Sequence, residues 1–283
     1  MNKINTSIIE SAHYQHKFQT RAHTSIPSIA AHSLEQNYLL AQLTMDEQSQ
    51  LLAHMELYAM EADEVIHETG LGIEWIYFPI NAVVSIGYIA ENGSTPSVAL
   101  TGKDGLIGLP ALLGSDHATH YASVITPGLS YRIKARQLKN ELARNNDLMQ
   151  IILLYSQLFF TQVSQTAVCN RLHSVEQQLC RHLLVNADLL EKDELNLTHE
   201  SIANMLGVRR EGITHAAGKL QHKSLIRYNR GKIHILDREG LENETCECYA
   251  AVCNERARLM PAAIPFTHTC MSKPIASYQY KMS

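Results

Sequence analysis

The clearest chemistry in this sequence lies in two adjacent side chains of opposite charge, Arg210 and Glu211. An arginine guanidinium can donate two parallel hydrogen bonds to O6 and N7 of guanine, and a carboxylate can accept one from N4 of cytosine. Because a carboxylate that faces a polyanion is otherwise unfavourable, we interpret Glu211 as a residue that contacts a base. The alternative is that Glu211 forms a salt bridge that orients Arg210, and the two roles are compatible.

Polar residues around this pair extend the candidate DNA-binding surface. We expect further base or phosphate contacts from Arg209, Thr214 and His215. Contacts to phosphates hold a protein in register on the duplex without reading its sequence. The residues predicted to make them are Thr198, His199, Lys223, Arg230 and Lys232.

Two short helices are predicted to position these residues. Thr198 is a good N-cap for the first helix, and Glu200 follows where the positive end of the helix dipole favours a carboxylate. Gly207 separates this helix from a second one, whose apolar residues recur at helical spacing up to Leu220. Two helices joined by a tight turn that contains glycine are typical of a helix-turn-helix.

A hairpin is predicted to follow the second helix. Residues 225–228 and 232–236 have the composition of two brief strands. The dipeptide Arg230-Gly231 lies at the turn between them, and glycine supplies the positive φ that such a turn needs. A helix-turn-helix followed by a hairpin is a winged helix.

The charge distribution supports a nucleic-acid partner for this segment. Residues 198–238 contain eight basic and three acidic residues, a net charge of +5. The whole chain carries −4, so the remainder carries −9. A basic module on an acidic body is the electrostatic pattern expected of a nucleic-acid-binding protein. The alternative is that the basic residues only solvate an exposed pair of helices.

The segment GVRREGITHAAGKLQHKSLIRYNRGKIHILD, residues 207–237, resembles the DNA-binding domain of the Crp/Fnr family of bacterial transcription regulators. In that family the recognition helix begins with Arg-Glu and carries another basic residue four positions after the Glu. Arg210 and Glu211 match the pair, and His215 stands where an arginine is common. The resemblance implies a winged helix-turn-helix that binds a pseudo-palindromic operator as a homodimer.

The first half of the chain has the pattern of helices followed by an antiparallel β domain. Apolar residues in 34–60 predict two helices, the second beginning with a capping box at Thr44 and Glu47. Asn92-Gly93 is a strong hairpin signal. Short strands with glycine turns indicate a sandwich or jelly roll. The predicted strands are 65–67, 75–78, 83–89, 98–100, 121–125 and 129–133.

The segments YFPINAVVSIGY and LTGKDGLIGLPALLG resemble the sensor domain of the same family, a barrel of the cyclic-nucleotide-binding type. Relatives that bind cyclic nucleotides carry Gly-Glu and, later, Arg-Ser or Arg-Thr before Ala. Here Leu109 follows the glycine, and His120 and Tyr121 precede Ala122. The sequence therefore argues against cyclic AMP. We expect an effector pocket at Leu109, His120 and Tyr121, for an effector that the sequence does not identify.

Two histidines of this region, His117 and His120, have open roles. They are candidates for binding a different anion or for sensing pH, or they are solvated loop residues. The N-terminal histidines, from His13 to His32, indicate either a metal-binding tract or an extended polar arm.

The cysteines give no recognisable cofactor motif. The oxygen-sensing branch of the family holds an iron–sulfur cluster through N-terminal cysteines, but the first cysteine here is Cys169. Cys246, Cys248 and Cys253 form C-x-C-x4-C, which is not a common zinc spacing and lacks an obvious fourth ligand. They indicate either a metal or redox site, or a short packed helix with buried thiols. We expect no metal and no cofactor.

A long segment without glycine or proline, residues 147–171, connects the two halves of the chain. Its apolar residues form two seams, and a helix that is apolar on two faces must bury both. The alternatives are a second subunit or the core of a monomer. We assign the dimer interface to the first seam, and the second contains Ile151, Leu154 and Leu158. The first seam consists of Leu148, Ile152, Tyr155 and Phe159.

We therefore expect an α+β fold with an N-terminal antiparallel β jelly roll, a long dimerisation helix and a C-terminal winged helix-turn-helix. Ser174 and Gln177 are predicted to cap the first helix of the DNA-binding domain. The expected domains are a flexible N-terminal arm (1–33), a sensor domain (34–144), a dimerisation helix (145–173), a winged helix-turn-helix domain (174–242) and a C-terminal tail (243–283).

Composition and motifs limit the remaining possibilities. No run of about 18 apolar residues and no secretory signal is present, and cysteines in such a chain are reduced by default. We expect a cytoplasmic protein with no membrane partner. The sequence has no Walker loop, nucleophile elbow or His-Glu-x-x-His, so we do not expect an enzyme.

Four partners are expected: double-stranded DNA, a second copy of the chain, RNA polymerase and an unidentified effector. The competing interpretation is a small-molecule-binding or protein-interaction module whose winged helix does not bind DNA.

Overall fold

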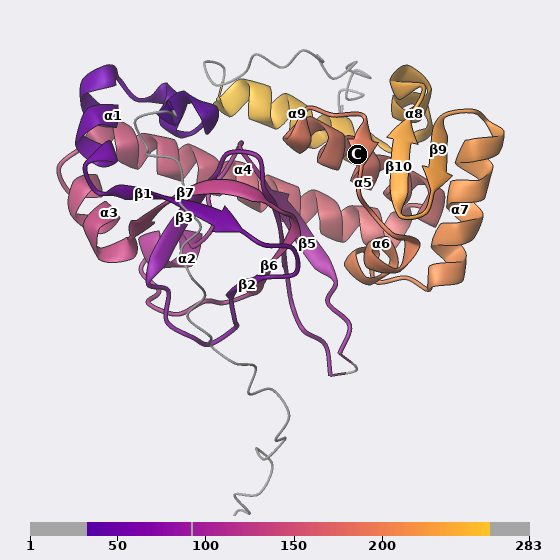
Figure 1. Ribbon diagram of the computed structural model, residues 1–283, viewed down its shortest axis with the longest axis horizontal. Coiled ribbons are helices and arrows are strands. Elements are labelled where there is room, and N and C mark those ends of the chain that lie inside the picture. Colours follow the sequence, from indigo (N-terminus) through magenta and orange to yellow (C-terminus); the bar gives the residue numbers. More distant parts are fainter. Residues whose placement is uncertain (1–32, 92, 261–283) are drawn as a thin grey trace, which may run out of the picture.

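The two halves of the chain form a β domain and a helical domain joined by one long helix (Figure 1). The structure is a computed structural model that describes residues 33–91 and 93–260. The histidines from His13 to His32 lie outside the described residues. Each helix of the described ranges is too short or too polar to span a lipid bilayer.

The described chain begins with short helical turns, η2 (Leu34–Gln36) and η3 (Leu40–Gln42), followed by helix α1 (Met45–Leu52). The predicted capping box is present, because Thr44 Oγ1 accepts from the backbone N–H of Glu47 and the Glu47 carboxylate accepts from that of Thr44. The helical prediction for residues 55–60 was wrong. This segment is strand β1 (Met55–Met60), which pairs with a strand far along the chain.

Two antiparallel sheets form the β domain, one with strand order β1-β7-β3 and the other with order β2-β6-β4-β5. They are not closed into a barrel, but they have the predicted antiparallel character. Strands β4 and β5 pair in antiparallel, but Asn92 of the predicted hairpin turn lies outside the described residues. The other strands are β2 (Val65–His67), β3 (Trp75–Pro79), β4 (Val83–Gly87), β5 (Ser97–Thr101), β6 (Tyr121–Thr126) and β7 (Gly128–Lys134).

The core of the β domain is shared with helices. Buried Ile76, Phe78 and Ile133 from β3 and β7 belong to the same apolar cluster as residues of the long helix. Helices α2 (Leu109–Leu112) and α3 (Ala135–Leu142) complete this domain. Gly108 adopts φ 101° before α2, where a side chain would meet Ile76.

The long connecting helix is α4 (Asn146–Leu172), close to the predicted range. Asn145 caps its start by accepting a hydrogen bond from the backbone N–H of Leu148. His173 ends it in an extended conformation, and Ser174 begins α5 (Val175–Leu190) with the predicted capping box. The junction between the two domains is therefore two residues long.

The helical domain contains the predicted winged helix. Helices α6 (His199–Leu206) and α7 (Arg210–His222) pack with α5 over a separate apolar core. Strands β9 (Ile226–Asn229) and β10 (Lys232–Ile235) form the hairpin, and β8 (Glu194–Leu195) adds a third strand beside β10.

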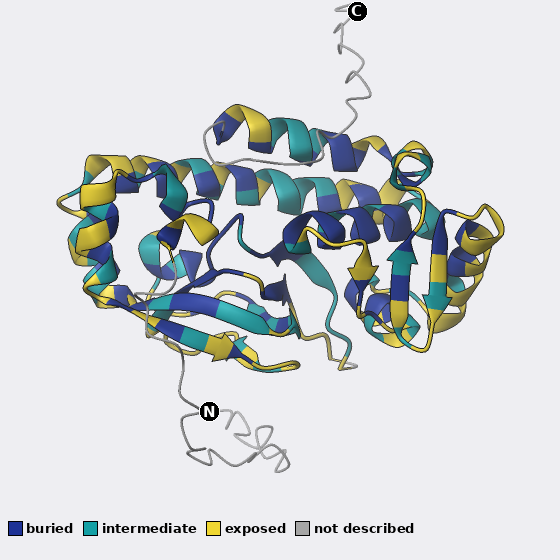
Figure 2. Ribbon diagram, turned by 45° about the horizontal axis from the view of Figure 1, so that its top comes forward, coloured by how far each residue is buried: buried dark blue, intermediate teal, exposed yellow. Residues whose placement is uncertain are grey.

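Two further helices follow the wing, α8 (Arg238–Glu244) and α9 (Glu247–Leu259). Helix α9 runs back along α4, as Figures 1 and 2 both show. Its buried residues Val252 and Leu259 join the apolar cluster of the β domain. Part of the segment expected to be a tail is thus a packed helix.

Candidate nucleic-acid interface

Helix α7 presents the predicted base-contacting residues to solvent. Its inner face is buried in the domain core through Ile213, Ala216, Ala217 and Leu220. Because residues three and four positions apart share a helix face, the residues between them point outward. Figure 2 shows this division along α7, the helix at the right edge. The exposed predicted residues are Arg209, Arg210, Glu211, Thr214 and His215.

The turn before α7 sets where these side chains begin. Gly207 ends α6 with φ 66°, a left-handed conformation that glycine adopts without strain. Arg209 is the N-cap of α7, so Arg210 and Glu211 occupy the first turn. The outer face borders an open hollow lined by Arg210, Glu211, Thr214 and His215.

Arg210 has a different acidic partner from the one considered on the sequence. Within the described ranges the structure pairs its guanidinium with Glu200 of α6, at 3.4 Å from Nη1 to Oε2, rather than with Glu211. Glu200 in the first turn of α6 therefore holds the Arg210 side chain at the N-terminal end of α7. Glu211 stays exposed on the outer face and is available for a base contact.

His199 links the two helices to the wing. Its Nδ1 lies 3.1 Å from Thr214 Oγ1, and its ring stacks on Tyr228 with 4.0 Å between centroids. Partial burial and the charge of Arg210 lower the pKa of His199. This neutral, packed histidine positions Thr214 and the wing, in addition to its predicted place near a phosphate.

The predicted phosphate contacts on the wing lie at its exposed tip. Arg230 and Gly231 have φ values of 46° and 82°, so both turn residues are left-handed, as a tight two-residue hairpin requires. Lys232 follows and lies 2.9 Å from a Glu194 carboxylate oxygen. Both side chains of this ion pair are about half exposed, so phosphate can replace the carboxylate at small cost.

The other two predicted phosphate contacts have structural roles. Thr198 caps α6 by accepting a hydrogen bond from the backbone N–H of Ser201. The Lys223 ammonium lies 2.7 Å from Glu244 and 3.5 Å from Glu176. Both carboxylates raise the pKa of Lys223, and Glu244 has the larger effect.

The seam assigned to the dimer interface was misplaced. Leu148, Ile152 and Tyr155 are at most 4% exposed, and Phe159 packs against the core of the same protomer. The Tyr155 hydroxyl donates to the carbonyl oxygen of Leu106 in the β domain. Leu148, Ile152 and Tyr155 are thus already buried and unavailable to a second subunit, and Phe159 is partly buried. The exposed apolar residues of α4 are instead Leu153, Phe160, Val168 and Leu172.

The residues predicted to form an effector pocket belong to the β domain, and one of them, His120, lies near α4. Leu109 and His120 are buried, and Tyr121 is half-buried on β6. The centroid of the His120 ring lies 6.5 Å from that of Phe159, so this histidine is near the long helix. His120 is thus not a solvated loop residue, whereas His117 is exposed.

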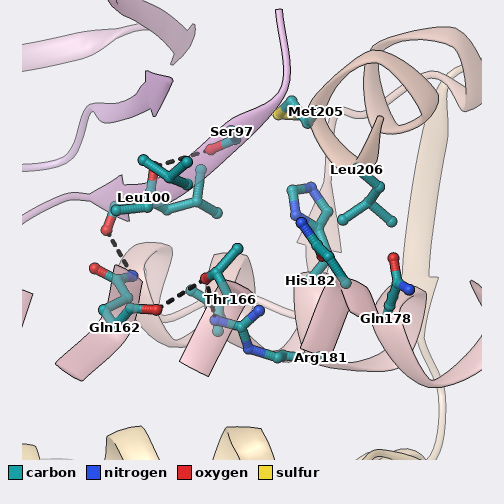
Figure 3. Close-up of a pocket in the computed structure, with 13 residues that line it drawn as sticks. Ser97, Leu100, Gln162, Thr166, Gln178, Arg181, His182, Met205 and Leu206 are labelled. Carbon is teal, nitrogen blue, oxygen red and sulfur yellow. Dashed lines mark hydrogen bonds between the residues drawn. The ribbon is translucent and has the colours of Figure 1, made fainter. Parts of the chain in front are cut away.

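A small cavity lies where β5, α4, α5 and α6 meet (Figure 3). Gln162 of α4 donates to the Leu100 carbonyl oxygen, and Arg181 of α5 donates to Thr166 of α4. Its volume of about 40 Å³ accommodates a few water molecules and no larger ligand. These hydrogen bonds tie α5 to the β domain through α4.

Sequence reasoning missed a cluster of potential metal ligands. Cys246 and Cys248 come together with Cys169 and His173, whereas Cys253 packs at the edge of the helical domain's core. The spacing of Cys169 and His173, one helical turn apart, was a signal that could have been found. Cys169 lies 77 positions before Cys246, and no sequence pattern indicates that the two pairs of residues meet.

Comparison with known proteins agrees with this architecture. Residues 177–244 match the family of Crp-like helix-turn-helix domains. This matched segment runs from α5 to the end of α8. The chain is 26% identical over 185 residues to a global nitrogen regulator of Nostoc sp., covering 62% of this chain and 82% of that protein. It is 21% identical over 199 residues to a global nitrogen regulator of Synechococcus elongatus, which covers 67% of this chain and 90% of that protein.

Solved structures share the fold at low sequence identity. A Crp/Fnr-family regulator from Eubacterium rectale has a TM-score of 0.58 and 20% identity, covering 73% of this chain and 98% of that chain. FixK2 from Bradyrhizobium japonicum has a TM-score of 0.58 and 14% identity, and the match covers 68% of this chain and 98% of that chain.

A β domain, a long helix and a helix-turn-helix domain of the Crp type are the architecture of a DNA-binding transcription regulator. The matched domain, the relatives and the shared fold together support a regulator of the Crp/Fnr type.

Proposed function

We propose that this protein binds a pseudo-palindromic operator as a homodimer and regulates transcription in response to a signal at its β domain. The observation that carries the proposal is the outer face of α7, where Arg210, Glu211 and His215 are exposed above a buried inner face. In a helix-turn-helix, this end of the second helix enters the major groove.

The proposed base contacts follow from side-chain chemistry. Arg210 exchanges Glu200 for guanine O6 and N7, and Glu211 accepts from cytosine N4. Arg209, Thr214 and His215 extend the contact along the groove. His199, Arg230 and Lys232 lie at α6 and the wing, where they fit phosphate contacts, whereas Thr198 and Lys223 contribute by keeping this surface in place.

The proposed dimer uses the exposed apolar stripe of α4. Leu153 and Phe160 are 47% and 67% exposed and lie seven positions apart, so they share one face of the helix. Val168 and Leu172 extend apolar surface toward the DNA-binding domain. A second copy of the same helix matches this stripe by two-fold symmetry, which also suits two half-sites about 34 Å apart.

The proposed signal path runs from the β domain through α4. An effector that contacts Leu109, His120 or Tyr121 acts on Phe159, and so on the helix that carries the dimer stripe. A shift of α4 changes the distance between the two copies of α7 and therefore the fit to the operator. RNA polymerase is the proposed downstream partner.

Selection of bound fragments from random duplex DNA tests the proposal. We expect a two-fold symmetric consensus whose half-sites are one helical turn apart, bound with a steep salt dependence. Recovery of random sequences only would contradict operator binding. Absence of binding to any duplex would favour the alternative, a winged helix that contacts proteins.

A further inference from the structure

A cluster of sulfur and nitrogen ligands lies outside the DNA-binding surface, where α4 ends and α9 begins. Cys169 and His173 stand one turn apart at the end of α4, while Cys246 and Cys248 stand at the start of α9. One ligand atom of each, three Sγ and one imidazole nitrogen, lies within 4.8 Å of all the others. Side chains 77 positions apart thus converge on one point.

Two distances within the cluster match the spacing of ligands around a tetrahedral metal ion. Cys169 Sγ lies 3.6 Å from Cys246 Sγ, and Cys248 Sγ lies 3.6 Å from His173 Nδ1. Zinc bonds of about 2.3 Å to sulfur and about 2.0 Å to nitrogen place tetrahedral ligands about 3.6–3.8 Å apart. A disulfide would need about 2.05 Å between sulfurs, so these two thiols are not bonded to each other.

The surroundings of the cysteines differ from those of thiols that only fill a core. Cys169, Cys246 and Cys248 form a buried cluster of their own, separate from the apolar cores of the two domains. By contrast, Cys180 of α5 belongs to the apolar core of the helical domain. Three buried sulfurs that contact one another and an imidazole leave a polar centre that a cation can fill.

His173 has the second partner that a metal-binding histidine needs. Its Nδ1 faces Cys248, while its Nε2 lies 3.3 Å from the Glu247 carboxylate. Histidines that bind metals usually donate the other ring N–H to a carboxylate or carbonyl group, which fixes the tautomer and the ring orientation. Glu247 stands between the two cysteines of α9 and so meets this need from the same helical turn.

We propose that Cys169, His173, Cys246 and Cys248 together bind one Zn²⁺ ion. Three thiolates and an imidazole form a closed tetrahedral set, which is typical of structural zinc sites and unsuited to Ca²⁺ or Mg²⁺. This site replaces the expectation from the sequence that the chain binds no metal. The proposal depends on these four side chains alone and does not require that the protein bind DNA.

The zinc ion closes a loop that contains the whole winged-helix domain. Helices α5 to α8 all lie between Cys169 and Cys246 in the sequence. His173 also forms the junction between α4 and α5, where Gln178 of α5 donates to its carbonyl oxygen. The metal therefore fastens both ends of the DNA-binding domain, together with α9, to the end of α4.

Metal content and cobalt spectroscopy test the site. We expect full-length protein produced with zinc to retain one zinc per chain after gel filtration in metal-free reducing buffer, measured by mass spectrometry of the metal. Replacement by Co²⁺ should produce sulfur-to-cobalt charge-transfer absorption and the strong visible bands of a tetrahedral ion. Protein that retains neither metal, or a cobalt spectrum without sulfur ligation, would overturn the proposal.

Matched cysteine variants distinguish the site from general effects of changing a buried thiol. Cys248→Ser should lose the zinc, whereas Cys180→Ser, equally buried but outside the cluster, should keep it. Equal zinc content in the two variants would contradict the assignment.

If Cys248→Ser does not fold, Glu247→Gln tests the same site. The Glu247 side chain is 72% exposed, so this substitution leaves the core unchanged. It should weaken zinc affinity about 10–100-fold in competition with a chelator, and unchanged affinity would count against the proposal.

Discussion

The guanidinium of Arg210 lies 3.4 Å from the carboxylate of Glu200, which joins the first turn of α7 to the first turn of α6. Both side chains are about two-thirds exposed, at 66% and 68%. An ion pair so exposed contributes only about 0–1 kcal/mol, so it holds Arg210 near the groove without competing strongly against a base. Glu211, the neighbour in sequence, is left to make its own contact.

The first prediction concerns specificity. Arg210→Ala should reduce the preference for the selected operator over random DNA by about 1–3 kcal/mol per half-site, because a bidentate contact to guanine is lost. Competition gel shifts measure this ratio. Arg136→Ala, which removes an exposed arginine from α3 in the β domain, is the matched control and should leave the ratio unchanged. Equal loss of specific and random binding by the Arg210 variant would reject the role in base recognition.

The second prediction concerns the wing. Arg230→Ala and Lys232→Ala should each weaken binding to all sequences and reduce the slope of log K against log salt by about 0.9, as expected for one phosphate contact. The slope is obtained by fluorescence anisotropy at several salt concentrations. Arg136→Ala again provides a charge-matched control. A slope equal to that of the unaltered protein would remove the residue concerned from the phosphate contacts.

The third prediction concerns the dimer. Phe160→Glu should shift the protein from dimer to monomer in sedimentation equilibrium, because it places a charge in the apolar stripe of α4. Leu113→Glu is the control, since Leu113 is also exposed, at 56%, but lies in the β domain. A Phe160→Glu protein that remains dimeric would show that a different surface forms the dimer.

The fourth prediction concerns acid stability. Burial lowers the pKa of both His67 and His182 to about 4, with smaller contributions from His120 and Arg181 respectively. Unfolded histidine titrates near 6.5, so between about pH 6.5 and 4 the unfolded chain binds protons that the native chain does not. The free energy of unfolding should therefore fall as pH falls through this window, by up to about 1.4 kcal/mol per pH unit for each histidine.

Urea unfolding at several pH values measures this dependence. His182→Gln should be less stable at pH 7, because the His182 ring nitrogen no longer contacts Asn186. Its stability should nevertheless decline less steeply below pH 6.5. A decline as steep as that of the unaltered protein would show that His182 does not contribute to the acid transition.

Much of the secondary structure could be predicted because its signals are local. The capping boxes at Thr44 and Ser174 each involve residues three positions apart, and both are present. The hairpin turn at Arg230 and Gly231 and the helix-turn-helix around Gly207 were likewise encoded within a few residues. The exposed face of α7 followed from helical periodicity, whereas the candidate base contacts followed from side-chain chemistry and from the resemblance to the Crp/Fnr recognition helix.

Pairing over long distances could not be predicted in the same way. Residues 55–60 had apolar residues that also suited a helix, but they form β1 because β7 offers a partner strand. Helix α4 had two apolar faces, and the sequence did not indicate which one the β domain covers. The structure buries Leu148, Ile152 and Tyr155 and leaves Leu153 and Phe160 exposed.

By itself, the amino-acid sequence determined the order of the elements and the helix face that carries Arg210 and Glu211, because helix spacing, caps and tight turns depend on neighbours within about one turn. Only the tertiary structure decided which groups meet from distant parts of the chain. It paired Arg210 with Glu200, and it brought Cys169 and His173 to Cys246 and Cys248. The cysteine–histidine cluster required α9 to fold back along α4, and that packing is set by the burial of apolar surface over the whole molecule.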